Sequence, residues 1–208
     1  MNKIKTIIII NFLLFTTGCA TIIEERKPDN INNACYILKE NKGWNRSLHF
    51  VEKDWGIEPN VILAIMFQES SFNHKARPVA GRRFFFFKHY KSSARGYSQA
   101  LDSTWDEYKE KNNKGRLTRR SSFSDSADFM GWYMNRTHKQ TGIQKNDAYN
   151  LYLAYHEGNG GWQRKTYQNK PWLIETSKKV QQRSSRFKNE ISSCDFPKGL
   201  WSRFFYKY

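Results

Sequence analysis

Cysteine, proline and acidic residues are all scarce in this chain. Its 208 residues include 3 cysteines and 5 prolines, and 19 Asp and Glu are outnumbered by 35 Lys and Arg. No cysteine pair has the Cys-x-x-Cys spacing, which argues against a zinc site. No apolar run reaches the length of a membrane-spanning helix, and no internal repeat is visible. What remains is a basic chain long enough for one domain with a proper core.

The first residues have the pattern of a secretory signal peptide. A basic start with Lys3 and Lys5 precedes the apolar stretch of residues 7–15. That stretch is too short to span a membrane and has the length of a signal-peptide core. We therefore expect residues 1–18 to be removed when the protein is exported.

Cys19 follows this stretch and resembles the lipidated cysteine of a bacterial lipobox. A small residue, Gly18, precedes it, although Thr16 stands where that motif usually has Leu. An acyl chain anchors a protein to a membrane without spanning it, and Ala20 in place of Asp gives no signal for inner-membrane retention. We expect an anchor at the periplasmic face of the outer membrane, with residues 19–33 as a tether. Ordinary cleavage near Gly18 or Ala20 is the alternative.

The charge of the chain points to an anionic partner. The formal net charge is +16, and loss of residues 1–18 removes two lysines and no acids, which leaves +14. A chain of this charge is attracted to polyanions. For an exported protein these are cell-wall carboxylates, anionic lipid and lipopolysaccharide, so we expect no nucleic-acid partner.

Two cysteines remain after Cys19. Cys35 and Cys194 lie near the two ends of the exported chain, and in an oxidising compartment they could form a disulfide that ties these ends together. Two buried thiols are the alternative. We place the folded domain at residues 34–195 and a basic, aromatic tail at residues 196–208.

Apolar periodicity and capping residues predict a mainly α protein with little or no sheet. Strand signals are sparse, and the segment 72–98 reads as long and irregular. The helices are expected at residues 34–55, as one or two pieces divided near Gly43, and at residues 59–70, 102–111, from 124 onward, 147–156 and 171–190.

Four consecutive phenylalanines at residues 84–87 are the one candidate strand inside the irregular segment. They could fill the core or form a lip over a cleft. With Lys88, Lys91 and Arg95 nearby, they could also touch anionic lipid.

Glu69 is the candidate for acid chemistry. It follows the apolar run of residues 61–67 by two positions, and apolar surroundings disfavour the charged form of a carboxyl group. Such a group holds a proton near neutral pH, as a general acid must. A surface glutamate near a helix end is the simpler interpretation.

Three short motifs follow one another along the predicted helices, and together they resemble the soluble lytic transglycosylase family of the lysozyme superfamily. That family reads Glu-Ser, then Gly-Leu-Met-Gln, then Ala-Tyr-Asn-Ala-Gly, and the resemblance covers roughly residues 45–165. This chain differs in the middle of the second and third motifs. The motifs here are Glu69-Ser70-Ser71-Phe72-Asn73, Gly96-Tyr97-Ser98-Gln99 and Ala154-Tyr155-His156-Glu157-Gly158.

The resemblance implies a single lysozyme-like domain of the goose-type helical kind. It implies that Glu69 first protonates the glycosidic oxygen between N-acetylmuramic acid and N-acetylglucosamine, and then takes the proton from the C6 hydroxyl. The product would carry a 1,6-anhydro sugar. No cofactor and no metal are implied, and we expect a monomer.

The resemblance also implies roles around Glu69. Ser70 would contact substrate, Gln99 would bind the sugar or hold Glu69, and Tyr155 would place its hydroxyl on Glu69. Gly96 would permit a close backbone approach or a positive φ. The residues expected to bind or orient the substrate are Ser70, Gly96, Tyr97, Ser98, Gln99, Tyr155 and Glu157.

Other functions stay open from the sequence. A hydrolytic muramidase would need a second carboxylate, either Glu157 or Asp102. A non-catalytic lipoprotein would have the same fold and would bind peptidoglycan without cleaving it. A nucleophile elbow at Ser98, with His138 or His156 as base, lacks the strand and parallel sheet that it requires.

Overall fold

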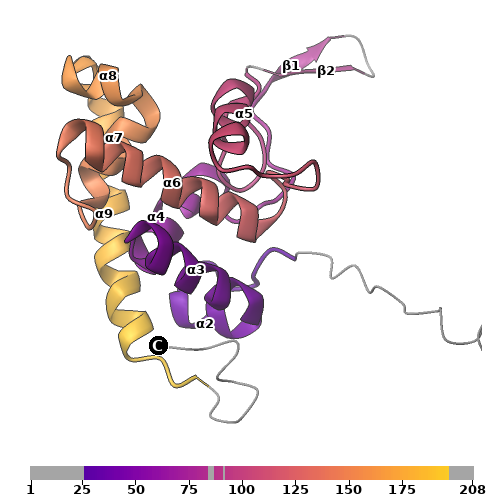
Figure 1. Ribbon diagram of the computed structural model, residues 1–208, viewed down its shortest axis with the longest axis vertical. Helices are drawn as coiled ribbons and strands as arrows, with labels where there is room; N and C mark the ends of the chain where they lie inside the picture. The colour runs from indigo at the N-terminus through magenta and orange to yellow at the C-terminus, as the bar shows by residue number, and fades with distance from the viewer. Residues whose placement is uncertain (1–25, 84–86, 91, 197–208) are drawn as a thin grey trace, which may run out of the picture.

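The computed structural model describes residues 26–83, 87–90 and 92–196 and confirms a mainly helical protein (Figure 1). Besides the helices, its described part contains one two-stranded antiparallel sheet. The helices are α2 (Ala34–Glu40), α3 (Lys42–Trp55), α4 (Pro59–Ser70), α5 (Asp102–Lys111), α6 (Phe123–Thr141), α7 (Ala148–Glu157), α8 (Asn159–Gln163), the 3-10 helix η1 (Thr166–Asn169) and α9 (Pro171–Ser192), and the strands are β1 (Val79–Arg83) and β2 (Phe87–Tyr90).

Helix α4 runs through the core and carries Glu69 in its last turn. Pro59 begins it, as suits a residue whose missing N–H would have no partner there. Every side chain from Val61 to Met66 is fully buried, and a helix that is apolar on all sides belongs inside a protein. Helix α4 ends where Ser71 and then Phe72 adopt left-handed backbone angles, with φ of 48° and 58°.

Four helices pack around α4. Helices α3, α6, α7 and α9 each contact it, and α3 also packs along α6. Figure 1 shows α9 running beside α4 and α7 along one edge of the molecule. The buried apolar side chains of all these helices form one cluster from Ala34 to Phe187. The end of α4 is therefore held from several directions.

The expected irregular segment is in part a β-hairpin, which corrects that prediction. Strands β1 and β2 pair antiparallel, with Val79 opposite Tyr90 and Arg83 opposite Phe87. The hairpin projects from the helices beside α5 (Figure 1). Residues 84–86 of the phenylalanine run lie outside the described residues.

Two details of the helices also differ from expectation. The break in the first helical segment falls at Asn41, and Gly43 lies inside α3. Gly158 ends α7 as expected, but α8 begins at the next residue and η1 follows. Short helices of this kind have too few residues for a periodic pattern, so sequence periodicity does not detect them.

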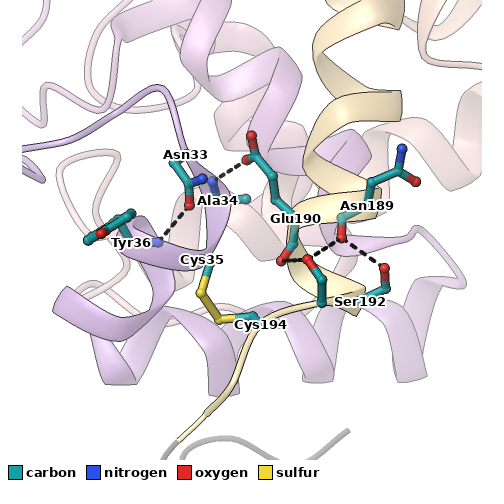
Figure 2. The surroundings of a disulfide bond; sticks show 9 residues. Asn33, Ala34, Cys35, Tyr36, Asn189, Glu190, Ser192 and Cys194 are labelled. Carbon is teal, nitrogen blue, oxygen red and sulfur yellow. Dashed lines mark hydrogen bonds between the residues drawn. A yellow bond between two sulfur atoms is a disulfide. The ribbon is translucent and has the colours of Figure 1, made fainter.

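A disulfide joins Cys35 to Cys194, as expected, and ties α2 to the end of α9 (Figure 2). The two Cα atoms are 5.4 Å apart, within the usual range for a disulfide. Beside it, the Ala34 backbone N–H donates to the Glu190 carboxylate at 2.7 Å. The Asn33 side chain accepts from the Tyr36 N–H and caps α2.

Several expectations fall outside the described residues. The signal peptide of residues 1–18, the proposed lipid attachment at Cys19 and nearly all of the tail at 196–208 are among them. Among the residues that the structure describes, no helix is long and apolar enough to cross a membrane.

Candidate active site

The carboxyl of Glu69 has the electrostatic character of a general acid. The residue as a whole is partly exposed, yet its carboxyl is enclosed well enough that burial raises its pKa from 4.5 to about 7, against the opposing effect of a hydrogen bond from Tyr152. Burial disfavours the carboxylate because the charged form loses its hydration. Near neutral pH a large fraction of Glu69 is therefore protonated.

Tyr152, and not Tyr155, donates a hydrogen bond to the Glu69 side chain. Burial raises the pKa of Tyr152, and the nearby Glu69 carboxylate raises it further. The Tyr152 hydroxyl is therefore a stable donor to that carboxylate. Tyr152 belongs to none of the three sequence motifs, but its i, i+3 spacing from Tyr155 puts both rings on one side of α7.

Tyr155 holds the glycine-containing loop instead. Its hydroxyl donates to the backbone carbonyl of Ser98 at 2.6 Å, which differs from the expected hydrogen bond to Glu69. Burial raises its pKa well above the ordinary value, and the charge of Glu69 adds to this shift. Tyr155 thus lies near Glu69 and connects α7 to the loop that precedes α5.

Gly96 is required by the backbone of this loop. Its φ is 74°, and a Cβ at this position would overlap the backbone carbonyl of Arg120. The Gly96 N–H donates to the Ala76 carbonyl at 2.9 Å, and the Tyr97 N–H donates to Arg120 at 3.1 Å. Both the close approach and the positive φ expected from the sequence are present, so Gly96 supports the site structurally.

Gln99 is fastened to the backbone by its amide nitrogen. This group donates to the Gly96 carbonyl at 2.7 Å and to the Ala76 carbonyl at 3.1 Å, while the residue itself has a φ of 50°. Gln99 also lines the cleft described below. Its Oε1 is the part of the side chain that remains for a ligand.

Tyr97 and Ser98 do not face solvent. Both are fully buried, and the Tyr97 ring packs edge-on against Trp44 and Phe123, with ring centroids 5.6 and 5.7 Å apart. Direct contact of these side chains with substrate is therefore not compatible with this structure. Tyr97 and Ser98 stand where the family has Leu and Met, and both side chains lie in the buried interior of the protein.

Ser70 has its hydroxyl turned back to its own helix. The Oγ donates to the Met66 carbonyl at 3.2 Å, a common arrangement for serine in a helix. The residue is partly exposed, and the lone pairs of Oγ remain able to accept a hydrogen bond.

A cleft of about 290 Å³ lies between the loop before α5 and the end of α7, with α6 contributing to its lining. Tyr155 connects this cleft to Glu69. Its side chain lines the cleft, and it lies close enough to Glu69 for the charge of that carboxylate to raise its pKa. Tyr133 and Thr104 lie outside the three sequence motifs, so no sequence signal marks them as cleft residues. The side chains and backbone that line the cleft belong to Gln99, Ala100, Leu101, Thr104, Phe129, Tyr133, Tyr155, His156, Glu157 and Gly158.

Glu157 lines the cleft but is held in a network of donors. Lys170 contacts its carboxylate at 2.6 Å, Thr166 at 2.5 Å and His156 at 2.9 Å. Burial alone would raise its pKa, but these donors outweigh burial and lower the pKa to about 2. Glu157 is therefore a carboxylate whose lone pairs are largely occupied.

Asp102 is also occupied by cations. The Arg120 guanidinium donates to it, and Arg95 lies 3.6 Å away. The hydrogen bond from Arg120, followed by the charges of the neighbouring arginines, lowers the pKa of Asp102. Among the described residues, no group of three or more His, Cys, Asp and Glu side chains is placed to hold a metal ion.

The lysozyme-like proteins have a mainly helical domain in which a buried helix ends in an acidic glutamate near the substrate cleft. Here Glu69 has a raised pKa, and its neighbour Tyr155 lines the cleft. The family model of the transglycosylase SLT domain matches residues 7–194, and the chain belongs to this family. Comparison with individual curated proteins gives no match. Family membership makes peptidoglycan in the cell envelope the general substrate and transglycosylation the general activity.

Proposed function

We propose that this protein is a peptidoglycan lytic transglycosylase that cleaves the β-1,4 bond between N-acetylmuramic acid and N-acetylglucosamine, with Glu69 as its general acid and then its base. The observation that carries the proposal is the Glu69 carboxyl, whose pKa burial raises to about 7. A group with this pKa is able both to give and to take a proton near neutral pH.

In the first step, protonated Glu69 donates its proton to the glycosidic oxygen, and the bond from that oxygen to C1 of the muramic sugar breaks. The hydrogen bond from Tyr152 then stabilises the carboxylate that forms. In the second step this carboxylate takes the proton of the C6 hydroxyl, whose oxygen bonds to C1. The 1,6-anhydro ring closes, Glu69 is protonated again, and no water is consumed.

The loop and its neighbours would place the sugar for these steps. Tyr155 and Gly96 fix the loop by the contacts described above, and Gln99 lines the cleft with its Oε1 as the group available to the sugar. Ser70, at the end of α4, can accept from a substrate hydroxyl. We assign Tyr97 and Ser98 a supporting role beneath the loop, because their side chains are buried.

The two candidate second carboxylates are poorly suited to a hydrolytic reaction. A general base for water needs a free lone pair close to the reacting carbon. Glu157 is occupied by Lys170, Thr166 and His156, and Asp102 by Arg120 and Arg95. This favours one carboxylate used twice over an acid and base pair.

The mass of the products decides between these functions. Purified peptidoglycan is digested, and the released muropeptides are weighed, because anhydro ends are lighter by one water than reducing ends. We expect anhydro ends, and we expect Glu69→Gln to release none. Reducing ends alone would show a hydrolytic muramidase. Retained binding to peptidoglycan without any product would show a non-catalytic binder.

We also propose that Cys19 is lipidated and holds the enzyme at the periplasmic face of the outer membrane, with residues 19–33 as the tether. The support is the sequence pattern of residues 1–19. Metabolic labelling with a fatty acid, followed by membrane fractionation, should find the label in the wild type and lose it in Cys19→Ser. Equal labelling of both proteins would exclude this site.

A further inference from the structure

A second and larger cavity, of about 640 Å³, lies on the other side of the loop that precedes α5. Its walls come from four parts of the chain: residues 74–77 after α4, residues 95–96 after β2, the first turns of α5, and residues 118–121 before α6. This volume is in the range of sites that bind small ligands.

The cavity is strongly cationic. Of its two acidic residues, Asp106 contacts Lys109 at 2.9 Å and Asp102 is paired with arginines. The charge of the cations therefore exceeds what the local acids neutralise. We call this cavity the basic pocket, and the six cationic residues that line it are Lys75, Arg77, Arg95, Lys109, Arg119 and Arg120.

Three further observations indicate that the basic pocket suits an anion. The arginines at positions 120, 95 and 77 lower the pKa of Asp102 through a hydrogen bond from Arg120 and through their charges, so the local field favours negative charge. Arg119 is exposed, and its guanidinium contacts no acidic side chain in the described part of the chain. The buried Nδ1 of His74 has no hydrogen-bond partner among the described residues.

The basic pocket and the cleft share one wall. Gly96 and Asp102 line the basic pocket, whereas Gln99 and Leu101, between them in sequence, line the cleft. On α5, Trp105 lines the basic pocket and Thr104 lines the cleft. A linear polymer in the cleft would therefore pass close to the basic pocket. A branch of that polymer could extend past the loop that precedes α5 and enter the basic pocket.

We propose that the basic pocket binds the free carboxylates of the peptide stems that branch from the glycan strand. This inference rests on the proposed function, which puts a peptidoglycan strand in the cleft. A carboxylate-bearing branch covalently attached to the strand matches both the charge of the pocket and its position. The pocket would thereby make the enzyme prefer strands that carry stems over bare glycan.

The test compares two substrates and two variants. The substrates are soluble glycan strands with intact, uncross-linked stems and the same strands after an amidase has removed the stems. For the wild type in 50 mM salt we expect a KM about tenfold lower on the stem-bearing strands. In Lys75→Glu/Arg119→Glu this ratio of KM values should fall to nearly one. Both residues are exposed, so the exchange disturbs no buried packing.

Lys42→Glu/Lys53→Glu on α3 is the matched control. It makes the same change in net charge at two exposed residues outside the basic pocket, and it should keep the tenfold preference. Salt of about 0.5 M should weaken the preference of the wild type, because it shortens the screening length to a few ångströms. An unchanged preference in Lys75→Glu/Arg119→Glu, or an equal loss in the control, overturns the proposal.

Binding separates this inference from the proposed function. Binding of Glu69→Gln protein to the stem-bearing and to the amidase-treated strands is measured directly, which needs no turnover. A preference for stem-bearing strands that depends on Lys75 and Arg119 supports the pocket even if no anhydro product is ever found. Anionic phospholipid vesicles form the last arm: binding to vesicles through these residues, without any preference for stems, would assign the pocket to lipid phosphate and overturn the proposal.

Discussion

At the level of single residues, the acidity of Glu69 results from its position on α4. The preceding turns of this helix are wholly buried, and the helix ends at the next residue, Ser70. The carboxyl thus emerges at the edge of the core, where burial raises its pKa and one tyrosine opposes the shift. The same burial that prepares the acid must also weaken the fold at high pH.

We predict that Glu69→Gln stabilises the protein above pH 7. The pKa of Glu69 is about 7 in the folded state against 4.5 as reference, so between these values the folded state holds a proton that the unfolded state has lost. Stability therefore falls as pH rises through this window, by up to about 3 kcal/mol. The neutral amide avoids this loss. Thermal unfolding should show a higher Tm for the variant at pH 8 and little difference at pH 4.

The exposed Glu110 on α5 provides the control. Glu110→Gln makes the same chemical exchange outside the site and should change the Tm by a similar small amount at both pH values. Equal Tm values for wild type and Glu69→Gln at pH 8 would mean that the carboxyl is better solvated than its surroundings suggest.

Tyr152→Phe and Tyr155→Phe should have different effects on the pH dependence of cleavage. The Tyr152 hydrogen bond lowers the pKa of Glu69, so its loss should move the alkaline limb of kcat to higher pH and reduce kcat about tenfold. Tyr155 bonds to the Ser98 carbonyl, and its loss should reduce activity through the loop and leave the alkaline limb in place. Identical pH profiles for the two variants would refute these separate roles.

The sequence points to the candidate acid more clearly than to the partner of its carboxyl. Glu69 stands out in the sequence because it follows the apolar run of residues 61–67 and begins the first of the three motifs. The partner of its carboxyl, Tyr152, lies 83 positions later, and only the packing of α7 against α4 brings it close. Ordinary tyrosine spacing cannot tell Tyr152 from Tyr155, so the sequence assigned the hydrogen bond to the wrong ring.

At the level of elements, helix α6 depends on a glycine where it meets α3. A Cβ at Gly131 would lie 2.6 Å from Trp55 Cδ1 and 2.7 Å from Val51 Cγ1. The Trp55 indole also donates to Asp128 of α6 at 2.7 Å, which limits how far this ring can move. We predict that Gly131→Ala lowers the free energy of unfolding by about 2 kcal/mol, as measured by urea unfolding.

Gly43→Ala is the matched exchange on the facing helix. Nothing lies within 4 Å of a Cβ at this position, so only the intrinsic helix preference changes and the protein should gain about 0.5 kcal/mol. A destabilisation equal to that of Gly131→Ala would show that the close approach of α3 and α6 is not the cause.

The helices that the sequence predicts correctly are those whose own residues include an apolar run or a capping side chain. Helix α4 has an apolar run and Pro59 in its first turn, and α7 begins after the capping side chain of Asp147. The β-hairpin was missed because Arg82, Arg83 and Lys88 interrupt any alternation of apolar and polar residues. Its strands pair with each other through the backbone, which the side-chain pattern does not record.

At the level of the whole molecule, one covalent bond joins the ends of the domain. Cys35 and Cys194 are separated by 159 positions, and a bridge across so long a segment restricts the unfolded chain strongly. The loop-closure relation gives about 5 kcal/mol for this length, and native disulfides usually contribute about 2–5 kcal/mol.

We therefore predict that Cys35→Ser/Cys194→Ser unfolds at a Tm several degrees below that of the wild type. Cleavage at 25 °C should be retained, because the disulfide joins α2 to the C-terminal end of α9, whereas the residues that line the cleft belong to other elements. Thiol labelling of unfolded Cys19→Ser protein should give no label without reductant and two labels with it. Reduction of that protein should lower its Tm to the value of the double serine variant, and a Tm unaffected by reduction would contradict the stabilising role of the bridge.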